Sequence, residues 1–178
     1  MNSLRFLNVV SYNSYVIYRR APWLYAEDTA QLKAEAVIQR EIKTSEHEQD
    51  NLILIGADTV VTLDKKIYGK PENDQHAKEM LQQFSGQTQN VYSGVCIFKG
   101  PSKKVVFHED TEVTFDTLSE EVIEAYIATK EPNDKAGGYG IQAIGGTLVE
   151  SIKGDYFNVV GFPLHRFCKE LEKLLKEP

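Results

Sequence analysis

The sequence feature that most constrains the fold is an apolar run that passes directly into small and polar residues. The aliphatic residues 52–55 are followed by Gly-Ala-Asp-Thr at positions 56–59. Four consecutive aliphatic residues that end in Gly-Ala predict a buried strand that stops sharply, with a second strand over residues 60–63. Asp58 would then lie at a strand end, where ligands meet α/β folds. The alternative is an ordinary turn residue, because aspartate is common in turns.

The composition is that of a globular protein with an acidic balance. The chain has 178 residues, 42% of them hydrophobic and 26% charged, and a net charge of -6. This length predicts one domain with a substantial core. The negative charge argues against broad binding to nucleic acids or membrane surfaces, although a small phosphorylated ligand needs only a few local cations. No apolar run approaches the length of a membrane span.

The cysteine content and the N-terminal sequence favour a cytoplasmic protein. Cys96 and Cys168 both stand among apolar residues and give neither a disulfide framework nor zinc-ligand spacing. We therefore expect two reduced thiols in the core. The N-terminal residues lack the pattern of a signal peptide, because polar residues interrupt the apolar stretch.

Hydrophobic periodicity predicts helices alternating with strands. One helix is expected over residues 28–42 with Asp28 as its N-cap, and another is expected to begin at Asn73 or Asp74. The helix after Ser119 is expected to bury Val122, Ile123, Tyr126 and Ile127. The helix after Pro163 is expected to have an apolar face of Leu164, Phe167, Cys168, Leu171, Leu174 and Leu175.

The β-strand signals complete a mixed α/β domain. Residues 91–98 and 104–115 are rich in β-branched and aromatic residues and predict a long antiparallel hairpin. Residues 64–66 predict a hairpin tip. The glycine-dense stretch 137–146 is expected to form a loop and not a helix.

Three further features could complete a phosphate site around Asp58. Lys33 lies beside the apolar face of the first helix and could reach inward, or it could extend into solvent. In Gly-Lys-Pro at 69–71, the proline restricts Lys70 to extended geometry, although Lys70 could also be a charged loop tip. The glycine-rich segment 134–142 can bring backbone N–H groups close to an anion. Its last residue, Gln142, can donate and accept, which suits reading the edge of a base.

Several short motifs stand in a distinctive order along the chain. They are Gly-Ala-Asp-Thr (56–59), Gly-Lys-Pro (69–71), Phe-Ser-Gly (84–86), Tyr-Ser-Gly-Val (92–95), Asp-Lys-Ala-Gly-Gly-Tyr-Gly-Ile-Gln (134–142) and Asn-Val-Val-Gly-Phe-Pro (158–163). As a set they resemble the Maf family of nucleotide pyrophosphatases, and in particular the Maf-like domain of acetylserotonin O-methyltransferase-like proteins. The resemblance implies an α/β fold related to the inosine triphosphate pyrophosphatases, with a mixed sheet, flanking helices, a cleft between two lobes and often a homodimer.

The resemblance also implies the reaction. Family members hydrolyse a nucleoside triphosphate to the monophosphate and pyrophosphate with a divalent cation such as Mg²⁺, Mn²⁺ or Co²⁺. Asp58 would be the catalytic carboxylate that activates water, directly or as a ligand of the metal. The resemblance gives substrate-binding positions to Lys33, Thr59, Lys70, Lys135 and Gln142. The threonine directly after the aspartate resembles the residue found at this position in the branch of the family that acts on dTTP and UTP.

The N-terminal residues depart from the family pattern. Family members open with a strand that leads into a Ser-x-Ser-Pro-Arg-Arg loop, whereas this chain has only an Arg-Arg pair at 19–20 without a preceding proline. We therefore divide the chain into a divergent segment, 1–24, and a Maf-like nucleotide pyrophosphatase domain, 25–178. Residues 6–18 are expected to form a replacement strand or to pack across the gap.

Two functional hypotheses follow from this departure. The first is an active nucleoside triphosphate pyrophosphatase, a hydrolase of acid anhydrides, that prefers dTTP and UTP. The second is a catalytically impaired nucleotide-binding or protein-interaction module, because the loss of an arginine clamp removes charge-assisted hydrogen bonds to phosphate.

Overall fold

The chain is made of two compact units that alternate along the sequence. The computed structural model describes residues 21–44 and 52–176. Unit 1 comprises Met1–Asp58, Ser93–His108 and Leu164–Pro178, and unit 2 comprises Thr59–Tyr92 and Glu109–Pro163. The predicted replacement strand and the Arg-Arg pair lie outside the described residues.

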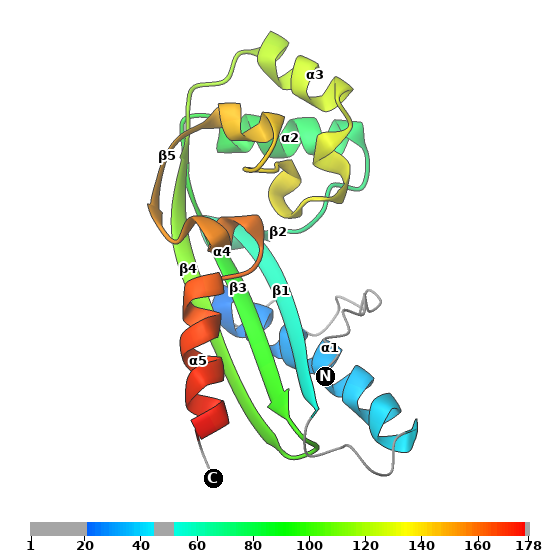
Figure 1. Ribbon diagram of the computed structural model, residues 1–178. Coiled ribbons are helices and arrows are strands. Elements are labelled where there is room, and N and C mark those ends of the chain that lie inside the picture. The colour runs from blue at the N-terminus through cyan, green and yellow to red at the C-terminus, as the bar shows by residue number, and fades with distance from the viewer. Residues whose placement is uncertain (1–20, 45–51, 177–178) are drawn as a thin grey trace. The chain divides into compact units, whose positions relative to one another are not determined.

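One sheet contains all the strands of the described residues (Figure 1). The strands are β1 (Ile53–Leu63), β2 (Lys66–Tyr68), β3 (Thr88–Lys99), β4 (Lys103–Phe115) and β5 (Val149–Gly154), in the order β2-β1-β3-β4-β5. A sharp turn joins β1 to β2, with Asp64 at φ 49° and Lys65 at φ 67°. The predicted hairpin tip and the long β3–β4 hairpin are therefore confirmed.

The strands run antiparallel, so the expected mixed sheet is wrong. β1 pairs antiparallel with β2, and β4 pairs antiparallel with β5. The Gly100 N–H donates to Leu52 O at one end of the β1–β3 pair, and the Thr62 hydroxyl donates to Asn90 O at the other. A helix connects β2 to β3, but these strands lie on opposite sides of β1. The helical connection therefore creates no neighbouring parallel pair.

The four predicted helices are present, although the first begins earlier than expected, and the described residues contain a fifth, short helix that was not predicted. They are α1 (Pro22–Thr44), α2 (Asp74–Phe84), α3 (Glu120–Ala128), α4 (Tyr156–Val160) and α5 (Leu164–Lys176). Asn73 caps α2 and Ser119 caps α3 through their side-chain oxygens. The helix α1 begins at Pro22, so Asp28 lies inside it and is not an N-cap. Proline is favoured at the first helical position.

In unit 1, α1 packs directly on the strands through small residues. A Cβ on Gly56 would lie 2.3 Å from Ala30 O, and a Cβ on Gly94 would lie 2.3 Å from the backbone of Ala26. The glycine after the aliphatic run is therefore a contact position and does not end the strand. The predicted break at Asp58 is wrong, because β1 continues from Ile53 to Leu63.

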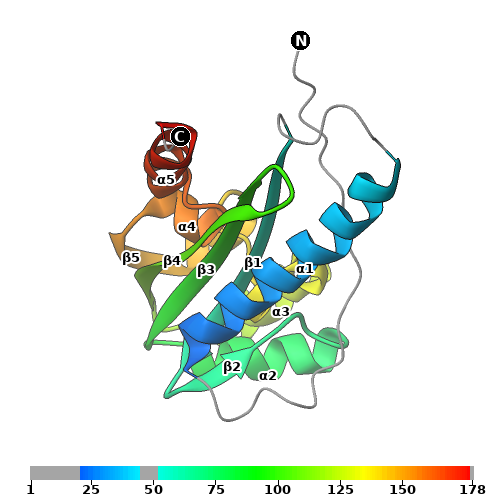
Figure 2. The same cartoon turned by 90° about the horizontal axis from the view of Figure 1, so that it is seen from below.

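The helices α1 and α5 cover opposite faces of the unit 1 strands (Figure 2). The side of β3 that carries Cys96 and Phe98 packs in one cluster with residues of α1. Lys99, the last residue of β3, donates from its Nζ to the backbone O of Leu174 at 3.2 Å, near the end of α5.

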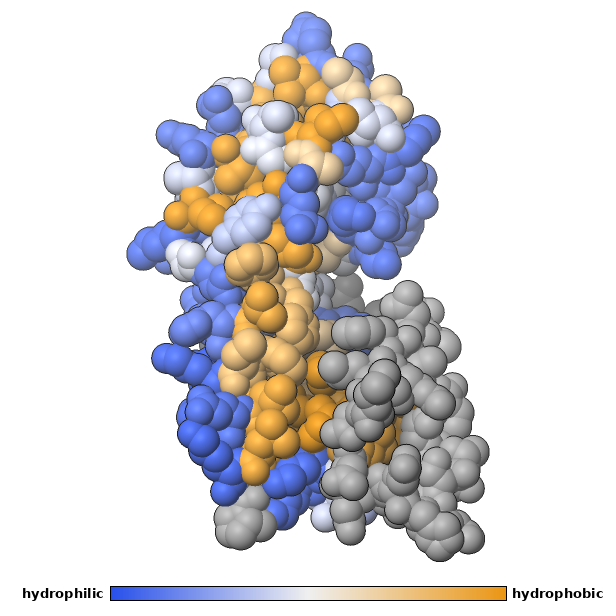
Figure 3. Space-filling model, viewed as in Figure 1, coloured by the Kyte–Doolittle hydropathy of each residue, from blue (hydrophilic) through white to orange (hydrophobic). Residues whose placement is uncertain are grey.

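The expected apolar face of α5 is only partly buried. Leu174 is buried, but Leu164 is 44% exposed and Leu175 is 53% exposed, and Cys168 is an exposed free thiol. Hydrophobic residues are visible at the surface along α5 in Figure 3. The buried side of the helix instead includes Glu170, which accepts from Arg166 Nε at 2.8 Å and from Lys173 Nζ at 3.0 Å.

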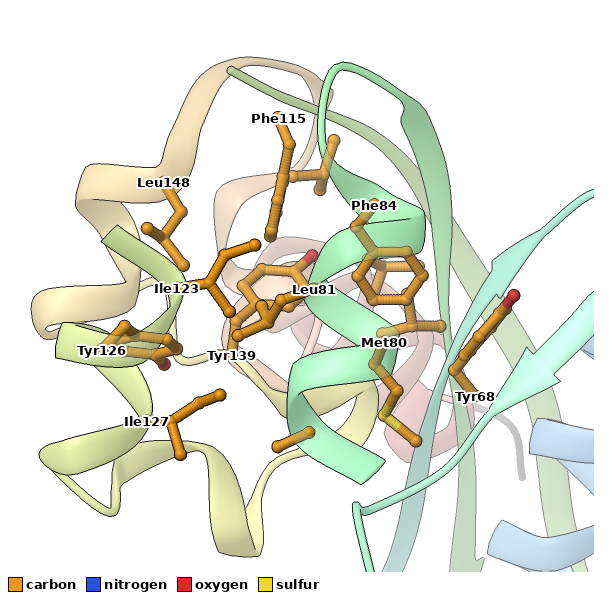
Figure 4. Packing of buried hydrophobic residues seen from close by; sticks show 14 residues of the cluster. Tyr68, Met80, Leu81, Phe84, Phe115, Ile123, Tyr126, Ile127, Tyr139 and Leu148 are labelled. Carbon is orange, nitrogen blue, oxygen red and sulfur yellow. The ribbon is translucent and has the colours of Figure 1, made fainter. Parts of the chain in front are cut away.

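Unit 2 is held by one cluster of aliphatic and aromatic side chains (Figure 4). Phe115 meets Phe84 and Tyr139 edge to face, with ring centroids 5.9 and 4.8 Å apart. Ile123, on α3, is buried as predicted, whereas Val122 is 44% exposed and its predicted burial is wrong. The glycine-dense stretch forms short 3₁₀ turns, including η4 (Ala136–Gly138) and η5 (Ile144–Leu148), and contains no α-helix.

The helices of the described residues also bear on membrane insertion. None of them combines the length with the apolar character that crossing a bilayer requires.

Candidate active site

Asp58 and Lys33 meet in unit 1. Lys33 Nζ lies 2.5 Å from Asp58 Oδ1 and also donates to Ala57 O at 3.3 Å. The two side chains are 29% and 18% exposed, respectively, so the pair is accessible but partly shielded from water. The contact of Ala30 and Ala34 with Gly56 sets the helix against the strand. This close approach brings Lys33 within reach of the carboxylate.

Two of the predicted lysines come from neighbouring loops of unit 2. The Gly137 N–H donates to Gly69 O at 2.9 Å, which ties the glycine-rich segment to the loop that carries Lys70. Lys135 Nζ donates to Asp134 Oδ1 at 2.6 Å. The hydrogen bond from Lys135 holds the pKa of Asp134 below its usual value, and the charge of Lys70 lowers this pKa further. Two cations therefore face one exposed carboxylate.

Thr59 follows Asp58 on β1 but belongs to unit 2. Its hydroxyl donates to Gly161 O at 3.3 Å, and this links β1 to the Asn-Val-Val-Gly-Phe-Pro motif. Within that motif, the Asn158 amide is fully buried and donates to Val91 O and to the Thr111 hydroxyl. The motif thus fixes the backbone against which Thr59 lies.

Gln142 lies in an exposed turn of the glycine-rich segment. Within the part of the chain that the structure describes, no hydrogen bond or ion pair joins its side chain to another candidate residue. Within unit 1 the structure brings Lys33 to Asp58, and within unit 2 it joins the loop of Lys70 to that of Lys135.

Two residues that contact this turn were missed by the sequence analysis. Tyr126 and Glu131 hydrogen-bond to the backbone N–H groups of Gly140, Ile144 and Gly145. The only sequence signal was a tyrosine and a glutamate on either side of a turn, and this pattern is also common in residues with no such role.

Among the candidate residues, Asp58 has a carboxylate that could hold a divalent cation. Among residues 21–44 and 52–176, no group of three or more His, Cys, Asp or Glu side chains could form a metal site. A Mg²⁺ ion at a nucleotide commonly takes one or two carboxylates and completes its shell with phosphate oxygens and water. A single accessible carboxylate such as Asp58 fits a cation that arrives with the nucleotide.

Comparison with known proteins shows the family to which the chain belongs. The profile of the family described as "Maf-like protein" matches residues 8–174, and the chain belongs to this family. The predicted family is therefore confirmed.

Among individual relatives, the chain is similar to enzymes of Bacillus cereus named dTTP/UTP pyrophosphatase. It is 52% identical to that of strain AH187 over 136 residues, which are 76% of this chain and 70% of the relative. For strain ATCC 10987 the identity is also 52%, over 76% of this chain and 66% of the relative. For strain B4264 the identity is 50%, over 76% and 70%, respectively.

Proposed function

We propose that this protein hydrolyses dTTP and UTP to the nucleoside monophosphate and pyrophosphate. The observation that carries the proposal is the Lys33–Asp58 ion pair at 2.5 Å in a chain 52% identical to dTTP/UTP pyrophosphatases. A carboxylate fixed by a lysine suits a reaction in which positioning and charge stabilisation supply most of the catalysis.

Asp58 is the proposed catalytic carboxylate. The reaction breaks the bond that joins the α-phosphorus to the β-phosphoryl group and consumes one water molecule. The oxygen of this water bonds to phosphorus, and pyrophosphate leaves. Asp58 orients the water and accepts its proton. The hydrogen bond from Lys33 Nζ holds the carboxylate in one orientation.

Lys33, Lys70 and Lys135 are proposed to neutralise phosphate charge. A triphosphate offers several anionic oxygens, and charge-assisted hydrogen bonds from lysines are stronger than neutral ones. In the free protein, Lys135 is paired with Asp134, whose side chain is 72% exposed. Because water screens an exposed pair, Lys135 can exchange this partner for a phosphate oxygen at low cost.

The base and the cation have proposed partners as well. Thr59 and Gln142 are proposed to select the pyrimidine base. Asp58 would hold a divalent cation, Mg²⁺, Mn²⁺ or Co²⁺, together with phosphate oxygens. When bound, such a cation supplies Lewis-acid polarisation of the phosphoryl group.

The family resemblance implies further structural features of this protein. The cleft between two lobes, the relation to inosine triphosphate pyrophosphatases and the division into residues 1–24 and 25–178 stay predictions. A cytoplasmic location is supported by the free thiols Cys96 and Cys168. A homodimer is supported by the exposed leucines of α5, and multi-angle light scattering of the purified protein tests it.

The decisive experiment is pyrophosphate release by the wild type and by Asp58→Asn. A panel of nucleoside triphosphates is incubated with Mg²⁺, Mn²⁺ or Co²⁺. We expect release from dTTP and UTP, and a loss of at least about 100-fold in kcat in Asp58→Asn with nucleotide binding retained. Asp64→Asn, in the exposed β1–β2 turn, is the matched control and should keep full activity.

The outcomes separate this function from the alternative. Release that persists in Asp58→Asn would remove the role of this carboxylate. If the folded wild type releases no pyrophosphate from any triphosphate but still binds nucleotide, the protein is the catalytically impaired nucleotide-binding module.

A further inference from the structure

The turn that carries Gln142 is anchored at both ends by side chains from outside it. At its start, the Gly140 N–H donates to Tyr126 Oη at 3.1 Å. At its end, the Ile144 N–H donates to Glu131 Oε2 at 3.1 Å, and the Gly145 N–H donates to Glu131 Oε1 at 2.9 Å. Residues 141–143 lie between the anchors, with Gln142 in the middle.

The two anchoring side chains are also joined to each other. The Tyr126 hydroxyl donates to Glu131 Oε1 at 3.1 Å, so this one hydroxyl donates to Glu131 and accepts from Gly140. Within the described residues the Glu131 carboxylate accepts three hydrogen bonds, two of them from backbone N–H groups. We call these two residues the Tyr126–Glu131 clamp.

The clamp rests on a rigid base. Tyr126 is 2% exposed and lies within the core cluster of unit 2 (Figure 4). Burial raises the pKa of the Tyr126 hydroxyl, which keeps it protonated and able to donate. On the other side, the Glu131 N–H donates to the Thr129 hydroxyl at 3.2 Å, which fixes the backbone of Glu131.

The turn is packed so closely on the clamp that its glycines have no room for a side chain. A Cβ on Gly145 would lie 2.5 Å from Tyr126 Oη and 2.8 Å from Gly140 N and O. A Cβ on Gly140 would lie 3.0 Å from Glu131 Oε1. The glycines therefore let both ends of the turn reach the same pair of side chains.

The clamp can hold Gln142 in place through the backbone of its turn. The Gln142 side chain is exposed and makes no hydrogen bond within the described residues, so only its backbone can hold it in place. Hydrogen-bonding groups that read a ligand must be held within a fraction of an ångström by surrounding contacts. Glu131 also begins η3 (Glu131–Asp134), the turn that leads to Lys135.

We propose that Tyr126 and Glu131 are positioning residues for base selection, because they fix both ends of the turn that presents Gln142. This inference rests on the nucleotide pyrophosphatase function proposed above. Neither residue needs to touch the substrate, and both act through Gln142.

The first arm of the test measures base preference. Tyr126→Phe keeps the ring and removes the hydroxyl, and Glu131→Gln keeps the shape and removes the charge. We expect the kcat/KM ratio of UTP over CTP to fall about tenfold in each variant, as in Gln142→Ala. In the double variant Tyr126→Phe/Gln142→Ala, the ratio should fall no further than in Gln142→Ala alone.

The second arm does not depend on activity. Amide hydrogen exchange at Gly140, Ile144 and Gly145 should be slow in the wild type and faster in both clamp variants. Tyr156→Phe and Glu150→Gln make the same chemical changes at exposed positions and should alter neither exchange nor base preference.

The two arms separate the possible failures. Unchanged exchange in the clamp variants would show that the clamp does not hold the turn. Faster exchange with an unchanged UTP/CTP ratio in an active wild type would overturn the role in base selection. If the wild type releases no pyrophosphate, the proposed function and base selection both fail, and hydrogen exchange still decides whether the clamp exists.

Discussion

Unit 1 and unit 2 fix their candidate residues in different ways. In unit 1, Lys33 reaches Asp58 because the backbone of a helix lies on a strand at Gly56, with almost no space between them. In unit 2, Lys70, Lys135 and Gln142 lie on loops that hydrogen bonds join to one another or to Tyr126 and Glu131. A close-packed backbone contact has no room for an added atom, whereas a hydrogen-bonded loop can lose one hydrogen bond and keep the others. The units should therefore respond differently to substitution.

The largest expected effect is that of Gly56→Ala. The added Cβ would lie 2.3 Å from Ala30 O, and neither backbone can move alone. We expect the free energy of unfolding to fall by about 3 kcal/mol, the upper end for overpacking, and the Lys33–Asp58 contact to open. Denaturant unfolding measures the loss. Gly69→Ala, where nothing lies within 4 Å of the added Cβ, is the control and should change stability by less than about 0.5 kcal/mol.

A smaller effect, confined to activity, is expected from Lys33→Met. This change removes the ammonium that holds Asp58 but keeps a long apolar side chain. We expect kcat for UTP to fall about 100-fold, the loss typical of one stabilising donor. Stability should change by less than about 1 kcal/mol, because the pair is partly exposed. Single-turnover kinetics and thermal unfolding check the two parts, and an unchanged kcat would show that Asp58 works without this partner.

The smallest effects are expected in the acid dependence of stability. The pKa of Glu170 in unit 1 is lowered mainly by its hydrogen bond from Lys173, and that of Asp134 in unit 2 by its hydrogen bond from Lys135. A lowered carboxyl pKa adds stability at neutral pH. This stability is lost as the pH falls below the ordinary values of 4.5 for Glu and 3.8 for Asp towards the lowered ones.

The two carboxylates should nevertheless differ in weight. The Glu170 side chain is 10% exposed and that of Asp134 is 72% exposed, so water screens the second pair far more. The unfolding midpoint of the wild type should fall as the pH drops from about 5 to about 3. We expect this fall to be smaller in Glu170→Gln and nearly the same as in the wild type in Asp134→Asn. Equal flattening in both variants would contradict the screening argument.

Local signals in the sequence were enough to predict much of the fold. Asn73 and Ser119 cap their helices through neighbouring backbone N–H groups, and the β1–β2 turn is formed by adjacent residues. Each of these structures depends on residues a few positions apart. The order of the motifs also predicted the family correctly, because the match spans most of the chain.

Structure that depends on contacts between distant segments could not be predicted from the sequence. From the sequence alone, Gly56 is expected to end a strand. Its contact with Ala30 depends on how α1 packs, and neighbouring residues in the sequence do not show this packing. Leu164 and Leu175 belong to the predicted apolar face of α5 but are exposed, because periodicity shows an apolar stripe and not which side of the helix meets the strands. Lys33 could be named as a candidate from sequence, but its contact with Asp58 depends on that same packing of α1.

The division of the chain has a consequence for how this protein can be rebuilt. The division falls inside three strands: β1 between Asp58 and Thr59, β3 after Tyr92 and β4 after His108. No uninterrupted stretch of sequence encodes either unit, so neither can be exchanged between relatives as a cassette or expressed as a simple fragment. Recombination between homologues must instead replace parts of individual strands. The division between the units falls at the peptide bond between Asp58 and Thr59, so an exchange of one unit would take these two neighbouring residues from different parents.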